Sequence, residues 1–152
     1  MIHAPLSRCF LLSRSIDFHL HSLRNTRERA IGGIQSGIIG LNQSVTWEAI
    51  HLGCRFRLTS KITELSKDHY FIDEMVKGPF KSLRHIHRFK PGNLTTWMTD
   101  ELSFETPYGL VGELAEKFIL RKYLYRILQQ RNTELKRAAE SDRWKVFLPA
   151  HI

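Results

Sequence analysis

Apolar and polar positions alternate along the middle of the chain in a way that predicts β-strands. A period of two places every second side chain on the same face of a sheet. Short links containing Gly, Pro or Asn interrupt the alternation, and links of this length join antiparallel neighbours. The predicted strands are Ser44–Leu52, Arg55–Glu64, His69–Lys77, Lys81–Lys90 and Leu94–Glu105, with a weaker pattern over Arg27–Gln35.

A longer period follows the strands. After Gly112 no Pro or Gly interrupts the chain as far as Glu140, and apolar residues recur every three or four positions. This spacing predicts a single unbroken helix from about Leu110 to Ala138 with one apolar face. A coiled-coil seam is the alternative, but the strands that precede the helix favour a sheet packed on it. Two shorter helices are predicted over Leu6–Leu12 and Ser15–Leu23.

Alternation also predicts which face of the sheet looks inward, and the turn lengths fix the register between strands. The resulting inward face carries one polar row, in which each residue lies opposite the next. A polar band in an apolar lining is a common construction for small-molecule pockets. The row consists of Trp47, Ser60, Asp73, His85 and Asp100; the flanking rows are Val45, Ile62, Phe71, His87 and Met98, and Ala49, Leu58, Met75, Leu83 and Leu102.

Length and composition limit the class of protein. A chain of 152 residues is expected to form one domain, over residues 1–140, followed by an apolar tail at 141–152. The net charge of +8 is spread along the chain, and the aromatic residues are predicted to point inward, so we expect no nucleic-acid partner. Two cysteines without metal or redox spacing fit a reducing cytoplasm. No apolar run is long enough for a transmembrane segment.

Several stretches carry a resemblance to a known family. They are IHAP, SIDFHLHS, VTWEAIHLG, FIDEMVKGPF, HIHRF, the Thr99-Asp100 pair, PYGLVG and the Arg131-Asn132 region. In these the chain resembles the SRPBCC superfamily, which includes START lipid-binding domains, birch-pollen-allergen-like proteins and polyketide cyclases, and most of all an uncharacterised bacterial branch of it.

The resemblance implies an α+β helix-grip fold, in which a curved antiparallel sheet of about six to seven strands wraps around a long C-terminal helix and leaves a cavity between them. In the family a full first strand precedes the turn that matches IHAP, whereas only Met1–His3 stand before it here, so we expect a truncated first strand. The resemblance also implies a possible sugar-nucleotide-epimerase-like protein partner.

From the pattern and the resemblance together, we expect the cavity to bind a small, largely apolar or lipid-like ligand, and we expect no cofactor. One alternative is a cyclase or dehydratase, in which His85 would move protons and Asp73 and Asp100 would orient it. Another is an interaction module for the epimerase-like partner. His85 and His87 also have a spacing found in metal sites, but further ligands would be needed, so we expect no metal. The candidate ligand-binding residues are Trp47, Ser60, Phe71, Asp73, Met75, His85, His87, Met98 and Asp100.

Overall fold

The computed structural model describes residues 1–51, 53–107 and 119–149. Two short helices come first, then six strands, then a long helix and a final 3-10 turn. The elements are α1 (Leu6–Arg14), α2 (Ile16–Ser22), η1 (Arg24–Thr26), β1 (Arg29–Gly33), β2 (Ser44–His51), β3 (Cys54–Ser66), β4 (Tyr70–Lys77), β5 (Ser82–Pro91), β6 (Thr96–Glu105), α4 (Arg121–Ala139) and η3 (Asp142–Val146).

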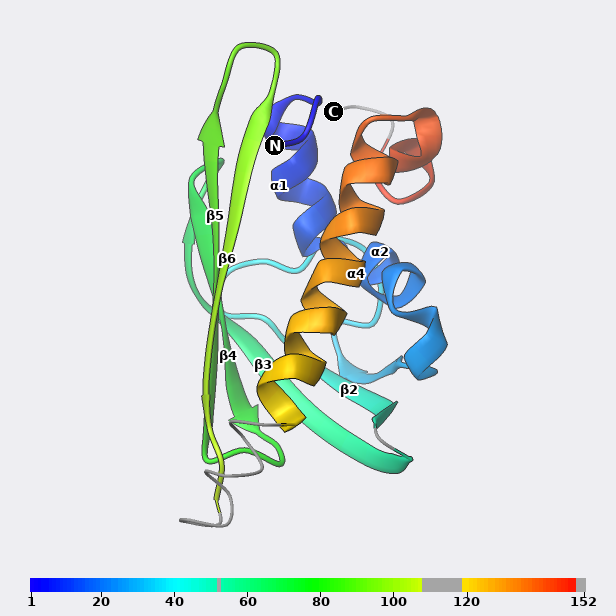
Figure 1. Ribbon diagram of the computed structural model, residues 1–152, viewed down its shortest axis with the longest axis vertical. Helices are drawn as coiled ribbons and strands as arrows, with labels where there is room; N and C mark the ends of the chain where they lie inside the picture. Colours follow the sequence, from blue (N-terminus) through cyan, green and yellow to red (C-terminus); the bar gives the residue numbers. More distant parts are fainter. Residues whose placement is uncertain (52, 108–118, 150–152) are drawn as a thin grey trace.

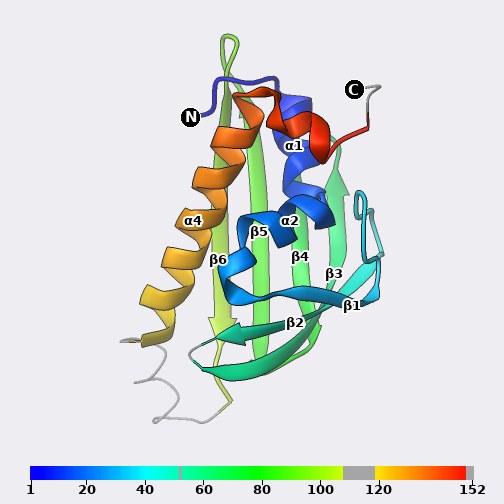
Figure 2. The ribbon, with the colours of Figure 1, turned by 90° about the vertical axis from the view of Figure 1, so that its right-hand side faces the viewer.

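The six strands form one antiparallel sheet in the order β1-β2-β3-β4-β5-β6. Every predicted strand is present, and most strand ends lie within two residues of the prediction. The sheet curves strongly, so that β1 and β2 run almost across the direction of β4, β5 and β6 (Figure 2). Irregularities in the β3–β4 pairing at Thr59/Ser60 and Ile62/Glu64 contribute to this curvature, because a bulge bends its strand.

The helices α1, α2 and α4 all lie on the concave face of the sheet, with α4 as the long element that crosses it (Figure 1). This is the helix-grip arrangement. Of the predicted C-terminal helix, residues 110–118 lie outside the described residues, and α4 covers Arg121–Ala139. Among the described residues, no helix is both long and apolar enough to span a membrane.

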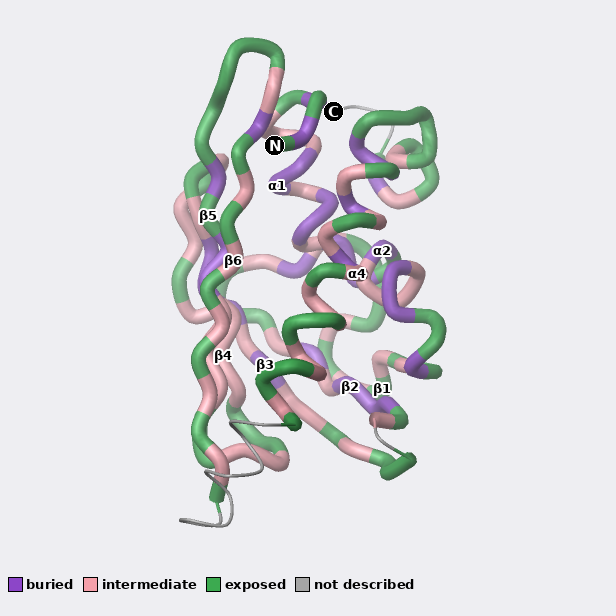
Figure 3. Tube along the Cα trace, viewed as in Figure 1, coloured by how far each residue is buried: buried purple, intermediate pink, exposed green. Residues whose placement is uncertain are grey.

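The core lies between the sheet and the three helices, where buried positions cluster in Figure 3. Phe10 of α1 packs edge-on against Phe71 and Phe89, with ring centroids 5.9 and 5.4 Å away. The segment after α4 also contributes, because Leu148 is 5% exposed within the core cluster and the ring of Phe147 packs on Phe18 at 5.4 Å. The apolar residues that follow α4 therefore pack on the domain.

The predicted pairing of Asp73 with His85 is confirmed, but three other registers are wrong by two residues. The β2–β3 hairpin turns between His51 and Cys54, one residue earlier than expected, so that Ala49 rather than His51 lies opposite Phe56. A shift of two residues moves each partner along its strand but keeps it on the same face. The predicted inward face therefore survives the wrong registers.

The other two registers fail for related reasons. The β3–β4 turn closes later than expected, with Ser66 opposite Tyr70, and a bulge in β3 offsets only part of this shift, so that Met75 rather than Asp73 lies opposite Ser60. The β5–β6 connection spans residues 92–95, whereas a two-residue turn was expected, and so His87 rather than His85 lies opposite Asp100. The predicted polar row is consequently not a straight line of opposed residues.

The edge of the sheet at β6 is bridged by the N-terminal residues. Ile2 forms an isolated antiparallel bridge with Thr96, through two backbone hydrogen bonds of 2.9 and 2.8 Å. Thr96 is fully buried, and its hydroxyl donates to the carbonyl of Ala4 at 2.8 Å. These bonds attach the N-terminal residues to the start of β6.

Candidate functional site

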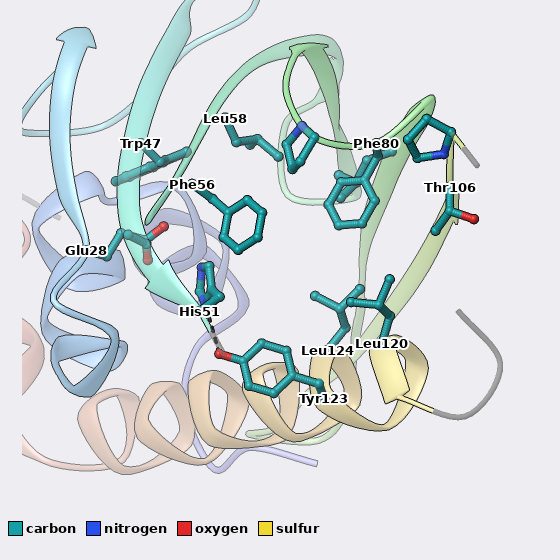
Figure 4. A pocket seen from close by; sticks show the side chains of 14 residues that line it. Glu28, Trp47, His51, Phe56, Leu58, Phe80, Thr106, Leu120, Tyr123 and Leu124 are labelled. Atoms are coloured by element: carbon teal, nitrogen blue, oxygen red, sulfur yellow. Dashed lines mark hydrogen bonds between the residues drawn. The ribbon is translucent and has the colours of Figure 1, made fainter. Parts of the chain in front are cut away.

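An apolar pocket of about 320 Å³ lies between the end of the sheet and the first turns of α4 (Figure 4). Its walls come from the inward faces of β2 and β3, from the β4–β5 connection and from α4. Most of the lining atoms are carbon, which suits an apolar ligand. The lining residues are Glu28, Trp47, Ala49, His51, Phe56, Leu58, Pro79, Phe80, Leu83, Thr106, Pro107, Leu120, Tyr123 and Leu124.

A few polar groups stand in this apolar lining. Nδ1 of His51 lies 2.9 Å from the hydroxyl of Tyr123, so that β2 is joined to α4 across the pocket (Figure 4). Glu28 is held by His19, whose Nε2 lies 3.1 Å from its carboxylate. Burial on its own would raise the pKa of Glu28, but the charge and hydrogen bond of His19 outweigh burial and lower it. Glu28 is therefore an ionised carboxylate that already has a partner.

A second, smaller cavity lies farther along α4, and we call it the polar chamber. Its volume is about 110 Å³, and residues from the sheet, from α1 and α2 and from α4 all line it. Trp47 belongs to the walls of both cavities, and its ring stacks on His19 with centroids 4.3 Å apart. The chamber lining is Ser13, Arg14, Ser15, Ile16, His19, Leu23, Ile39, Val45, Trp47, Ile62, Phe71, Asp73, His85, His87, Ile127, Leu128 and Arg131.

A hydrogen-bonded cluster around Asp100 forms one wall of the polar chamber. Nε2 of His85 lies 2.9 Å from Oδ1 of Asp100, and Asn132 of α4 donates its amide to Oδ2 of the same carboxylate. Nδ1 of His87 lies 2.7 Å from Oδ1, although its geometry is not that of an aligned hydrogen bond. The carboxylate thus connects two strands of the sheet to the C-terminal helix.

These contacts set the charge of the cluster. Burial would raise the pKa of Asp100, but the hydrogen bond with His85 and the charge of the Arg131 guanidinium outweigh burial and hold that pKa far below its ordinary value. Burial, together with the nearby His85, keeps the pKa of His87 well below its ordinary value. Asp100 is therefore an anion and His87 a neutral ring that stacks on Phe71 at 4.2 Å.

Asp73 and Arg131 face the polar chamber, and no described residue forms a direct ion pair with either of them. Arg131 is 5% exposed, and its Nη2 donates to the carbonyl of Ser13 at 2.8 Å, but its buried Nη1 has no hydrogen-bond partner among the described residues. Oδ1 of Asp73 is likewise buried and unpartnered within that part of the chain. Burial raises the pKa of Asp73, which the Ser60 hydroxyl and the charge of His85 oppose only in part.

His85, His87 and Asp100 could also hold a metal ion, because one ligand atom from each lies within 4.8 Å of the others. Two features oppose this use. The buried guanidinium of Arg131 places a positive charge close to Asp100 and His87, which lowers the affinity for a cation. Asn132 also occupies the second oxygen of the carboxylate. We therefore interpret the cluster as a hydrogen-bond network.

The structure brings together five of the nine predicted ligand-binding residues at a cavity wall. Trp47 lines both cavities, and Phe71, Asp73, His85 and His87 line the polar chamber. The other four residues line neither cavity. Ser60 lies beside Asp73, and Met75 is its partner on β4. Asp100 lies behind the two histidines, and the sulfur of Met98 lies 3.8 Å from the Ser13 hydroxyl.

Sequence reasoning missed Glu28, Tyr123 and Arg131. A signal for Arg131 was present, because it stands on the apolar stripe of the helix between Leu128 and Leu135, where a charged residue is out of place. Glu28 offered no such signal. It precedes a short strand, and only the curvature of the sheet brings it to the pocket.

Comparisons with solved structures agree with the fold. The chain is similar to TTHA0849 from Thermus thermophilus, with 17% identity, a TM-score of 0.73 and 91% of each chain covered. It is also similar to major latex-like protein 151 from Panax ginseng, with 14% identity, a TM-score of 0.63 and coverage of 92% of this chain and 93% of that one. Ara h 8.0201 matches at 9% identity with a TM-score of 0.59, over 88% of this chain and 92% of that one.

At these identities the likeness shows the helix-grip fold that the resemblance implied, and nothing finer. No protein-family model matches the sequence. No curated protein matches it either.

Proposed function

We propose that the protein binds a small, largely apolar ligand in the apolar pocket between the sheet and α4. The observation that carries this proposal is the pocket itself, about 320 Å³ in volume and lined mostly by aliphatic and aromatic side chains with a few polar groups. Ligand pockets typically range from about 300 to 1,000 Å³ and have this composition. The pocket therefore suits a compact ligand of modest size, which the helix-grip resemblance also leads us to expect.

A cyclase or dehydratase activity has less support from the geometry. Nε2 of His85, the candidate acid–base group, is engaged by Asp100 at 2.9 Å, and His87 is 2% exposed beneath the ring of Phe71. The epimerase-like partner that the resemblance implied has no support from the comparisons. We therefore base the proposal on ligand binding.

The experiment is a fluorescence titration with the neutral apolar probe N-phenyl-1-naphthylamine. We expect the probe to bind the wild-type protein with a blue shift and to bind Ala49→Phe much more weakly, because residue 49 lines the pocket and a phenyl ring there fills it. Ile50→Phe is the matched control, since Ile50 is the next residue of β2 and is 37% exposed on the outer face.

Circular dichroism would show that both variants are folded. The proposal is wrong if the wild-type protein does not bind the probe, or if Ala49→Phe and Ile50→Phe bind it equally well.

A further inference from the structure

Arg131 presents a buried cation with an unused hydrogen-bonding edge. Its side chain lies in the interior between α4 and the sheet and is anchored by one bond, from Nη2 to the Ser13 carbonyl at 2.8 Å. Nη1 is buried and unpartnered among the described residues, none of which contributes a carboxylate in ion-pair contact with it. A buried charge is costly unless a counter-charge and hydrogen bonds compensate it. Arg131 is therefore placed to receive an anion.

The polar chamber in front of Arg131 has room for an anionic group and little more. Its volume of about 110 Å³ corresponds to roughly three or four water molecules at about 30 Å³ each. The unpartnered Nη1 can donate a charge-assisted hydrogen bond to a carboxylate oxygen, and a carboxylate group fits this space. The chamber is too small to hold a complete apolar ligand as well.

Asp73 completes the chamber on the side of the sheet. Its Oδ1 is buried and unpartnered within the described residues, as is the Ser60 hydroxyl beside it. Burial raises the pKa of Asp73, which favours the neutral acid. A protonated Asp73 donates a hydrogen bond to an incoming carboxylate and does not repel it.

The chamber adjoins the apolar pocket. Trp47 lines both cavities, and α4 contributes Leu124 to the pocket and Leu128, one turn later, to the chamber. The Glu28 carboxylate in the pocket wall is already paired with His19 of the chamber wall, so it does not offer a free site for a cationic group. A ligand with its apolar part in the pocket would therefore have its end near Arg131.

We propose that the polar chamber is the head-group subsite for a carboxylate carried on the apolar ligand, with Arg131 as the anion-binding residue and Asp73 as a second hydrogen-bond donor. The inference rests on the proposed function, because the apolar pocket must hold the remainder of the ligand. It narrows the ligand to an apolar monocarboxylic acid of modest size.

The test compares two probes that differ only in the head group, octanoate and 1-octanol, by displacement of N-phenyl-1-naphthylamine at fixed pH and salt. We expect octanoate to bind the wild-type protein at least tenfold more tightly than 1-octanol. A hydrogen bond to a charged group contributes about 1.5–3 kcal/mol, and about 1.4 kcal/mol corresponds to a tenfold difference in affinity. Arg131→Gln should reduce octanoate affinity to that of 1-octanol and leave 1-octanol unchanged.

Arg126→Gln is the matched control. Arg126 lies on the same helix at an exposed position, so this variant removes one positive charge without touching the chamber. It should keep the preference for octanoate. If both variants lost the preference for octanoate equally, the preference would come from the overall positive charge, and the proposed carboxylate subsite would be wrong.

If Arg131→Gln does not fold, the wild-type comparison and Ser60→Ala still decide the matter. Ser60→Ala should keep the preference for octanoate, because losing the hydroxyl beside Asp73 removes an interaction that favours the ionised form of that carboxyl group. Octanoate that binds no better than 1-octanol overturns the head-group inference and leaves the proposed function standing. Failure of the naphthylamine probe and of both octyl compounds to bind overturns both.

Discussion

Nε2 of His85 lies 2.9 Å from Oδ1 of Asp100, although the residue opposite Asp100 in the β5–β6 ladder is His87. The contact is possible because a long side chain can reach its diagonal neighbour on the next strand. Asn132 of α4 binds the other oxygen of the same carboxylate. Asp100 therefore joins β5, β6 and the C-terminal helix at the wall of the polar chamber.

The first prediction concerns this carboxylate. Asp100→Ala should lower the free energy of unfolding by about 3–5 kcal/mol, because it removes the buried carboxylate that His85 and Asn132 contact. Chemical denaturation would measure the change. Glu101→Gln is the control, since Glu101 is the next residue of β6 and its ion pair with Arg88 is exposed, so its loss should cost less than about 1 kcal/mol. Equal effects would show that the Asp100 cluster adds nothing to stability.

The second prediction concerns pH. Burial depresses the pKa of His87 in the folded protein, so the unfolded chain binds a proton below about pH 6.5 that the folded chain does not. The folded state must therefore lose stability as the pH falls through that value, by up to about 1.4 kcal/mol per pH unit. Two other groups of this region also change the stability with pH. The lowered pKa of Asp100 makes the folded state lose further stability in more acid solution. The raised pKa of Asp73 makes the folded state gain stability as the pH falls.

Comparison with a variant isolates the His87 contribution. The stability difference between wild type and His87→Asn should shift in favour of the variant as the pH falls from 7 to 5, because Asn binds no proton in the unfolded chain. A His87→Asn difference that stays constant with pH would mean that His87 is charged in the folded protein.

The fold was predictable from the sequence because the period-two and period-3.6 patterns are local properties. The strands and the inward face depend only on alternation, and both were correct. The registers depend on where each turn begins and on irregularities in the β3–β4 pairing, between Thr59 and Ser60 and between Ile62 and Glu64, that alternation alone does not reveal. The four-residue turn before Thr96 was missed for the same reason, since Gly92-Asn93 alone suggested a tighter one.

The candidate site was less predictable than the fold. Residues on neighbouring strands, such as Asp73 and His85, could be placed together by counting along the ladder. Contacts between the sheet and the helices depend on curvature and on helix rotation, which no local pattern fixes. For this reason only the structure revealed the positions of Arg131 and Glu28 and the hydrogen bond between Tyr123 and His51.

The third prediction concerns the start of β6. Thr96→Val should cost about 1–3 kcal/mol, because the buried carbonyl of Ala4 loses the hydroxyl that now donates to it at 2.8 Å while the side-chain volume hardly changes. Thermal unfolding would show this as a fall of several degrees. Thr99→Val, at an exposed position of the same strand, should change the melting temperature little. Similar melting temperatures for both variants would mean that the Ala4 bond does not anchor the N-terminal residues.

The last prediction concerns the segment after α4. Leu148 is 5% exposed within the core cluster, and its amide hydrogen-bonds to the carbonyl of Trp144 at 3.1 Å, so its position is fixed by the backbone of η3 as well as by packing. Leu148→Ala should therefore leave a cavity and cost about 2–5 kcal/mol.

Val146 provides the matched control for this segment, because it is two residues away and 79% exposed. Val146→Ala should change stability by less than about 0.5 kcal/mol, as surface substitutions usually do. Urea denaturation of both variants would measure the difference. If Leu148→Ala were as stable as Val146→Ala, this segment would not be part of the core in solution. The packing of Phe147 on Phe18 should then be absent as well, and the two aromatic rings would give no mutual contacts by nuclear magnetic resonance.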